Sequence, residues 1–161
     1  MGQWVDATTI KAARAAGIAC AALLAALLVA SAWLPQIVFW TPAPRADERM
    51  LLALLVGMPL SLGLALRDPV RNAGVFAVIG LGCGFVAAAR VMSVLVGEPA
   101  PDPWWLATIA YLTIGVALVV TYTRLRRPHP IIVRVVVVAT VLMPAVLYVY
   151  DWAVRTLAAR G

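Results

Sequence analysis

The acidic side chains, which could serve acid–base chemistry or proton transfer, lie at the edges of long apolar segments. Seven carboxylates are present: Asp6, Asp47, Glu48, Asp68, Glu98, Asp102 and Asp151. We place each of them in a loop, at a terminus or at a segment boundary. A proton relay across a membrane needs ionisable groups inside the spans, so this pattern argues against a carboxylate relay.

Histidine and cysteine are too few for the usual metal, haem or disulfide chemistry. His129 is the single histidine, whereas a bis-histidine haem needs two and a catalytic metal needs about three converging ligands. Cys20 and Cys83 cannot form a disulfide scaffold or a Cys-ligated cluster, and we interpret them as small buried side chains. The sequence also lacks a Ser–His–Asp set, a phosphate-binding glycine loop and a metalloprotease signature. We therefore predict no cofactor, no metal and no enzymatic activity.

The composition assigns the chain to the membrane. Its 161 residues are 64% hydrophobic and 12% charged, whereas soluble domains have about 45–50% and about 25%. A soluble fold of this size needs far more polar surface, and disordered segments are poor in apolar residues. The sequence predicts an integral membrane protein.

Uncharged runs locate the spans, because one charge at mid-bilayer costs at least ~2.5–3.5 kcal/mol. Proline-rich turns separate these runs. We predict an all-α membrane protein, a single domain over 1–161, built as a bundle of five transmembrane helices with short loops. The predicted helices cover 12–40, 50–67, 71–97, 104–126 and 131–155. The first resembles a signal peptide with its Ala30-Ser31-Ala32 sequence, but its apolar stretch continues to Trp40, so we expect an uncleaved anchor.

The basic residues favour a cytoplasmic N-terminus. That orientation places eight of them inside and four outside, as the positive-inside rule prefers. Most Trp and Tyr residues then fall at the outer interface, where such side chains are enriched. The eight inner residues are Lys11, Arg14, Arg67, Arg71, Arg124, Arg126, Arg127 and Arg134.

Arg90 is the charged residue that interrupts an apolar segment. It lies roughly 27 Å along its predicted helix at ~1.5 Å per residue, near the outer boundary. Its side chain either snorkels to the lipid headgroups or pairs with an outer carboxylate. In the second case, an outer-face polar cluster would bind an anionic headgroup or a small polar ligand, or brace the loops. The cluster would comprise Arg90, Asp47, Glu48, Glu98 and Asp102.

Small residues at helical spacing mark two faces for close helix packing, within the chain or against a partner. In the third predicted helix they are Ala73, Ala77, Gly80, Gly84 and Ala87. In the first they are Ala15, Ala19, Ala22, Ala26 and Ala30.

The net charge of +6 does not indicate nucleic-acid binding, because most basic residues lie at the predicted inner membrane surface. We expect Arg124, Arg126 and Arg127 to contact anionic lipids, with an acidic partner as the alternative. Arginine outnumbers lysine twelve to one, which suits a GC-rich bacterial genome and the bacterial inner membrane.

An Arg-x-x-Ser run at a helix end, Arg90 to Ser93, is followed by Gly97-Glu98-Pro99. This pattern resembles small bacterial four-helix membrane proteins of unknown function related to the DoxX-like group, over about residues 15–125. The resemblance implies a fold plan and no established activity, and the fifth predicted span departs from that plan.

Three function classes follow. We favour a non-catalytic accessory or assembly subunit of a larger membrane complex, with other membrane subunits or a second copy as partners. The alternative is a small oligomeric permease or channel with a narrow path lined by Ser61, Thr108, Thr113 and Thr140. A third class, an enzyme using the loop carboxylates at the outer face, has only paired acids to support it.

Overall fold

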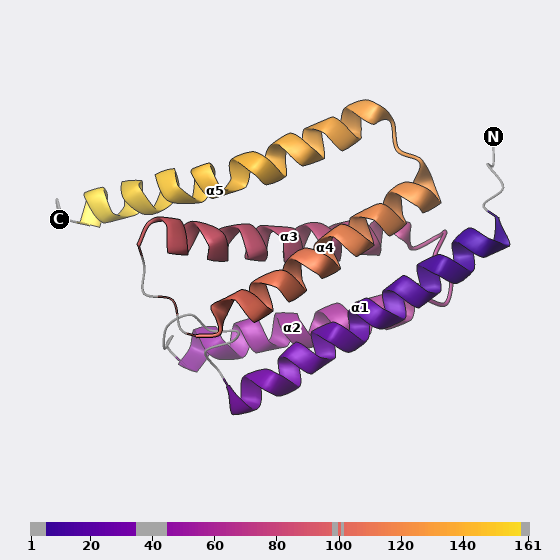
Figure 1. The fold of residues 1–161 in the computed structure, drawn as a ribbon, viewed down its shortest axis with the longest axis horizontal. Helices are drawn as coiled ribbons and strands as arrows, with labels where there is room; N and C mark the ends of the chain where they lie inside the picture. Colours follow the sequence, from indigo (N-terminus) through magenta and orange to yellow (C-terminus); the bar gives the residue numbers. More distant parts are fainter. Residues whose placement is uncertain (1–5, 35–44, 98–99, 101, 159–161) are drawn as a thin grey trace.

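The computed structural model describes residues 6–34, 45–97, 100 and 102–158, and of these the side chains of 45–51 and of residue 132 are left aside. The described chain folds into five helices, which confirms the predicted all-helical architecture (Figure 1). They are α1 (Ala7–Trp33), α2 (Arg45–Ala65), α3 (Ala73–Leu95), α4 (Trp104–Arg126) and α5 (Pro130–Ala158).

Helix α4 has the predicted bounds, whereas α1 is shifted towards the N-terminus. Helix α1 begins at Ala7 rather than residue 12 and ends at Trp33, so the prediction that it continues through Leu34 was wrong. Leu34 has φ −133° and ψ 72°. It precedes Pro35, and a residue before proline is pushed out of the helical region. Residues 35–40 lie outside the described part of the chain.

Helix α2 begins earlier than predicted, at Arg45 rather than residue 50. Asp47 and Glu48 therefore belong to its first turn and not to a loop. Carboxylates are favourable at this position because the free N–H groups give a helix N-terminus a partial positive charge. The other bounds differ from the predicted ones by one to three residues.

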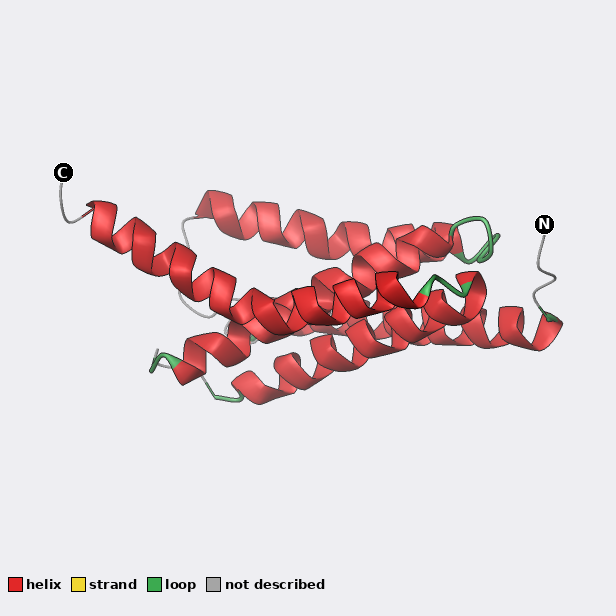
Figure 2. Cartoon of the chain, turned by 90° about the horizontal axis from the view of Figure 1, so that it is seen from above, coloured by secondary structure: helices red, strands yellow, loops and turns green. Residues whose placement is uncertain are grey.

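Helices α1 to α4 form a closed ring of neighbours, and α5 lies outside it. Helix α1 packs on α2 and α4, and α3 packs on α4 and α2. Helix α5 packs against α3 (Figure 1). Its last turns, which lead to the C-terminus, run obliquely to the other helices (Figure 2). The fold is therefore a four-helix ring with an added peripheral helix.

The tightest contact in the ring joins α3 to α4 through glycine. A Cβ atom on Gly115 would lie 3.0 Å from the backbone oxygen of Gly80 and 3.1 Å from the backbone nitrogen of Gly84. A Cβ on Gly80 would lie 3.0 Å from the Cβ of Leu118. The two backbones approach closely because these positions carry no side chain. The buried core continues through Phe76, Leu24 and Ile114.

Among the described residues, four helices are long and apolar enough to cross a membrane: α1, α3, α4 and α5. The apolar part of α2, Leu52–Ala65, is shorter. Large apolar side chains also cover the outside of the fold, with Val78 72% and Val141 71% exposed. By length and composition this is the architecture of a multi-pass membrane protein.

Candidate functional site

Arg90 lies in the last turns of α3, and its side chain turns into the bundle. Only 7% of its surface is exposed. The α3 segment before it carries the buried residues Ile79, Cys83 and Ala87 at intervals of three or four, so position 90 falls on the same inward face. The local sequence thus places a permanently charged group between α3 and α4.

Two oxygens from the first turns of α4 hold the guanidinium. The Nε atom donates to the Oγ1 atom of Thr108 at 3.1 Å, and an Nη atom donates to the backbone oxygen of Trp104 at 3.3 Å. The Thr108 hydroxyl itself donates to the same Trp104 oxygen at 3.0 Å. One residue of α3 is thereby fixed to both members of an i, i+4 pair on α4.

This arrangement holds a positive charge in a fixed position. Arginine stays protonated at physiological pH and offers a rigid fork of donors that suits a carboxylate or phosphate. The Arg90–Trp104–Thr108 network therefore braces one end of the bundle and brings a fixed positive charge there.

The structure places the other members of the predicted outer-face polar cluster only in part. Asp102 is exposed in the turn before α4. Asp47 and Glu48 lie on the first turn of α2, but their side chains are outside the described part, as is all of Glu98. Pairing of Arg90 with one of these carboxylates stays a prediction.

An apolar groove of about 460 Å³ runs between α3, α4 and α5, and we call it the α5 groove. Its walls are aliphatic side chains and small residues, apart from the hydroxyls of Thr108 and Thr140. Thr108 thus contacts Arg90 and also borders this groove. Ser61 borders a different groove, and Thr113 is exposed, so the four predicted path residues do not share one path.

The five small residues predicted as a packing face of α3 have different surroundings. Ala73, Gly80 and Ala87 are buried, and Gly80 meets α4. Gly84 and Ala77 are half-buried, and a Cβ added at Gly84 would meet nothing within 4 Å. This face of α3 thus packs on α4 at Gly80 and Gly84, and both glycines also border the α5 groove.

Basic side chains gather at the opposite end of the bundle, where α1 and α5 begin and α4 ends (Figure 1). We call it the basic end. The turn between α2 and α3 is bound there from two sides: Arg14 donates to the backbone oxygen of Arg67, and Arg126 to that of Arg71, each at 3.4 Å. Arg124, Arg126 and Arg127 are all exposed at this end, as their predicted contact with lipid requires.

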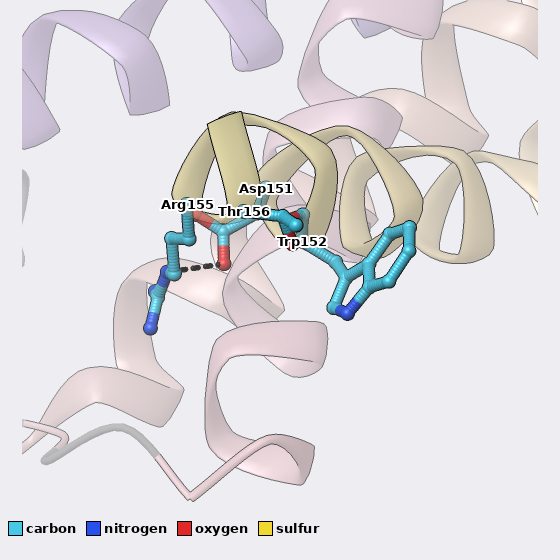
Figure 3. Close-up of polar contacts among 4 residues, drawn as sticks. All are labelled: Asp151, Trp152, Arg155 and Thr156. Carbon is cyan, nitrogen blue, oxygen red and sulfur yellow. Dashed lines mark hydrogen bonds and ion pairs between the residues drawn. The ribbon is translucent and has the colours of Figure 1, made fainter. Parts of the chain in front are cut away.

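The far end of α5 carries a local ion pair. Arg155 Nε lies 2.8 Å from Asp151 Oδ2, and Thr156 donates to the backbone oxygen of Trp152 at 2.7 Å (Figure 3). The Trp152 indole points away from this pair (Figure 3) and is 61% exposed. Both charged side chains are more than half exposed, so the pair stabilises the helix only slightly.

Thr108 is the site residue whose role the sequence did not reveal. The sequence predicts it as a lining residue of a permeation path, and in the structure it accepts a hydrogen bond from Arg90 and also borders the α5 groove. The signal in the sequence is that Thr108 lies four residues after Trp104, at the start of the helix that follows the loop after Arg90. That spacing puts both residues on one face of α4 but leaves open which residue of α3 they meet.

Within the described part of the chain, no three His, Cys, Asp or Glu side chains gather as a metal site would require. Comparison of the chain with protein-family models, curated proteins and solved structures gave no match. The resemblance to DoxX-related membrane proteins stays a prediction.

Proposed function

We propose that this chain is a non-catalytic accessory or assembly subunit of a larger membrane complex, and that α5 is its docking helix. The proposal includes five membrane crossings, a cytoplasmic N-terminus and the bacterial inner membrane. It rests on one observation: α5 is a 29-residue apolar helix outside the ring, and none of its described side chains is buried.

The packing of α5 supports a protein partner. Lipid tails are as apolar as valine, so helices in a bilayer associate through close packing and not through the hydrophobic effect. The α5 groove leaves that packing incomplete on the inward side of the helix. A partner helix that covers the groove beside α5 would supply the missing contacts.

The outward face of α5 has the spacing of a helix-packing surface. Its exposed residues, each at least half exposed, recur at intervals of three or four, and we call them the α5 stripe: Val135, Val138, Leu142, Val146 and Val149. β-Branched and leucine side chains at this spacing form the ridges that interdigitate between helices.

Site-specific photo-crosslinking tests the proposal. A photoreactive phenylalanine at Leu142, in the α5 stripe, should give a discrete adduct with one other membrane protein. The same group at Leu60 on α2, which is 64% exposed, should give lipid adducts. Lipid adducts alone at both positions would contradict the proposal, and an adduct of twice the chain mass would support the oligomeric permease instead.

A pair of glycine variants tests whether the α5 groove takes part. Gly84 borders the groove and Gly82 does not, yet a Cβ at either would meet nothing within 4 Å. Gly84→Phe should remove the partner from material purified in mild detergent, while Gly82→Phe should retain it in its normal ratio, as quantified by mass spectrometry. Equal retention by both variants would restrict docking to the outer face of α5.

A further inference from the structure

A second groove, of about 510 Å³, lies between α2 and α3 at the basic end, and we call it the α2–α3 groove. Its mouth is polar, with Arg71 and Asn72 in the turn just before α3, and Ser61 lines it from α2. Its walls deeper along α3 are apolar: Val75, Val78 and Ile79. The change from polar to apolar follows the helix from the end of the bundle towards its middle, over about 12 Å at ~1.5 Å per residue.

We infer that this groove binds one anionic phospholipid, with its phosphate at Arg71 and Asn72 and an acyl chain along Val75 and Val78. Amphiphilic lining in this order fits a lipid better than a water-soluble anion. A soluble anion would gain nothing from the apolar walls, whereas an acyl chain gains close contact with them.

Charge complementarity selects an anionic headgroup. Arg126 of α4 donates to the backbone oxygen of Arg71 at 3.4 Å, so a second guanidinium lies beside the mouth of the groove. The nearby acid, Asp68, accepts a hydrogen bond from the backbone nitrogen of Arg71 at 3.1 Å. A basic side chain at a membrane surface attracts anionic lipid by about 1 kcal/mol, so a pair favours it over zwitterionic lipid.

The mouth is also held in place before any ligand binds. Asn72 donates from its backbone nitrogen to the Asp68 backbone oxygen at 3.0 Å and from its side chain to the same oxygen at 3.1 Å. Arg14 of α1 anchors the same turn at Arg67. A turn held by α1, by α4 and by its own hydrogen bonds loses little conformational freedom on binding, which favours a defined site over diffuse attraction.

Native mass spectrometry with added lipid tests the inference. The full chain in mild detergent is titrated with phosphatidylglycerol and, separately, with phosphatidylethanolamine of the same acyl chains. We expect one phosphatidylglycerol to bind preferentially and Arg71→Gln to weaken it about fivefold. Arg134→Gln, which removes an exposed charge of α5 at the same end but outside the groove, should have a much smaller effect. Equal binding of both lipids, or equal losses in both variants, would overturn the inference.

The acyl-chain part has its own test. Gly74 borders the groove, and a Cβ there would meet nothing within 4 Å, so Gly74→Leu should block the chain. Gly63→Leu is the control, because Gly63 is equally open but borders no part of this groove. If Gly74→Leu reduces folding, Val78→Trp is the second variant that should block the acyl chain, because position 78 is 72% exposed.

A headgroup without chains separates lipid from simple anion binding. Glycerol phosphate should fail to displace the bound lipid at equal concentration. Displacement, or unchanged lipid binding in both Gly74→Leu and Val78→Trp, would show that the acyl chain lies elsewhere and would overturn the assignment. These results do not depend on any protein partner at α5.

Discussion

The guanidinium of Arg90 donates hydrogen bonds to the side-chain oxygen of Thr108 and to the backbone oxygen of Trp104, both on α4. Removing one partner of a buried hydrogen bond costs more than removing both, because the remaining group keeps its desolvation penalty. This asymmetry makes the network testable by substitutions that change little in shape.

Thr108→Val should destabilise the fold by about 1–3 kcal/mol, because it deletes the acceptor of the buried Arg90 Nε and keeps the side-chain volume. The matched control is Thr113→Val on the same helix, at an exposed position, which should stay within about 0.5 kcal/mol of the wild type. Thermal or denaturant unfolding in detergent micelles measures both. Equal stability of the two variants would mean that the Arg90–Thr108 contact does not hold α3 to α4.

Arg90→Leu combined with Thr108→Val should recover most of the stability lost by Thr108→Val alone. Replacing a buried charge and its partner by apolar groups of similar volume is often neutral or stabilising. The four proteins of this double-mutant cycle give the coupling energy directly from their unfolding curves. A double variant less stable than Thr108→Val would place the main role of Arg90 in contacts other than the one with Thr108.

At the scale of helices, the close contact between α3 and α4 depends on Gly80 and Gly115. Gly115→Ala should destabilise the fold by about 1–3 kcal/mol, because its Cβ would press on backbone atoms of α3 that cannot move independently. Gly82→Ala, with open space around it, should be neutral or slightly stabilising, since alanine is the better helix former. The measurement is the unfolding midpoint of each variant relative to the wild type. An unchanged midpoint for Gly115→Ala would show that α3 and α4 separate easily.

The sequence predicted the helices better than the faces they bury. Both ends of α4 were predicted correctly, because Pro103 precedes the helix and Pro128 follows Arg127. In the structure Arg127 ends the helix in the left-handed region, at φ 43°. In α1 the predicted alanine face does not pack within the chain, since Ala15, Ala19, Ala22 and Ala26 are exposed, and its packing against a partner stays a prediction. The buried stripe contains Ala13, Gly17, Cys20, Leu24, Leu27 and Ser31. When both faces of a helix are apolar, no hydrophobic period distinguishes the lipid side from the protein side.

Of the residues in the candidate site, the sequence alone pointed only to Arg90. Arg90 was identified because a charge inside an apolar segment is expensive. Its contacts with Trp104 and Thr108 depend on the register between α3 and α4, which the close approach at Gly80 and Gly115 sets. Neither the α5 groove nor the peripheral place of α5 had a signal, because both arise from tertiary packing.

At the scale of the whole molecule, the two ends of the bundle differ in charge and in aromatic content. Exposed basic residues gather at one end, whereas Trp33, Trp105 and Trp152 lie exposed at the other. From the positive-inside rule we propose that the basic end faces the cytoplasm. Cys20 and Cys83 are both buried, so single cysteines introduced into exposed turns report the orientation without a background from the native thiols.

Asp102→Cys should react with a membrane-impermeant maleimide in intact cells, and Asp68→Cys should react only after the membrane is permeabilised. Both positions are exposed turn residues at opposite ends of the bundle, so they differ in side and not in accessibility. The readout is the mass shift of the purified protein on a denaturing gel. The reverse labelling pattern would contradict the cytoplasmic N-terminus.

The same assay decides whether α5 crosses the membrane. The accessory-subunit proposal requires this crossing, because it treats α5 as a membrane-spanning docking helix. Ala158→Cys, at the exposed end of α5, should label in intact cells, whereas His129→Cys, exposed just before the helix, should stay protected until permeabilisation. The 26-residue segment from Val133 to Ala158 reaches about 39 Å at ~1.5 Å per residue, enough for a ~30 Å core even when tilted. Protection of both cysteines would leave α5 along the inner surface, where it could not pack lengthwise against a partner's transmembrane helix.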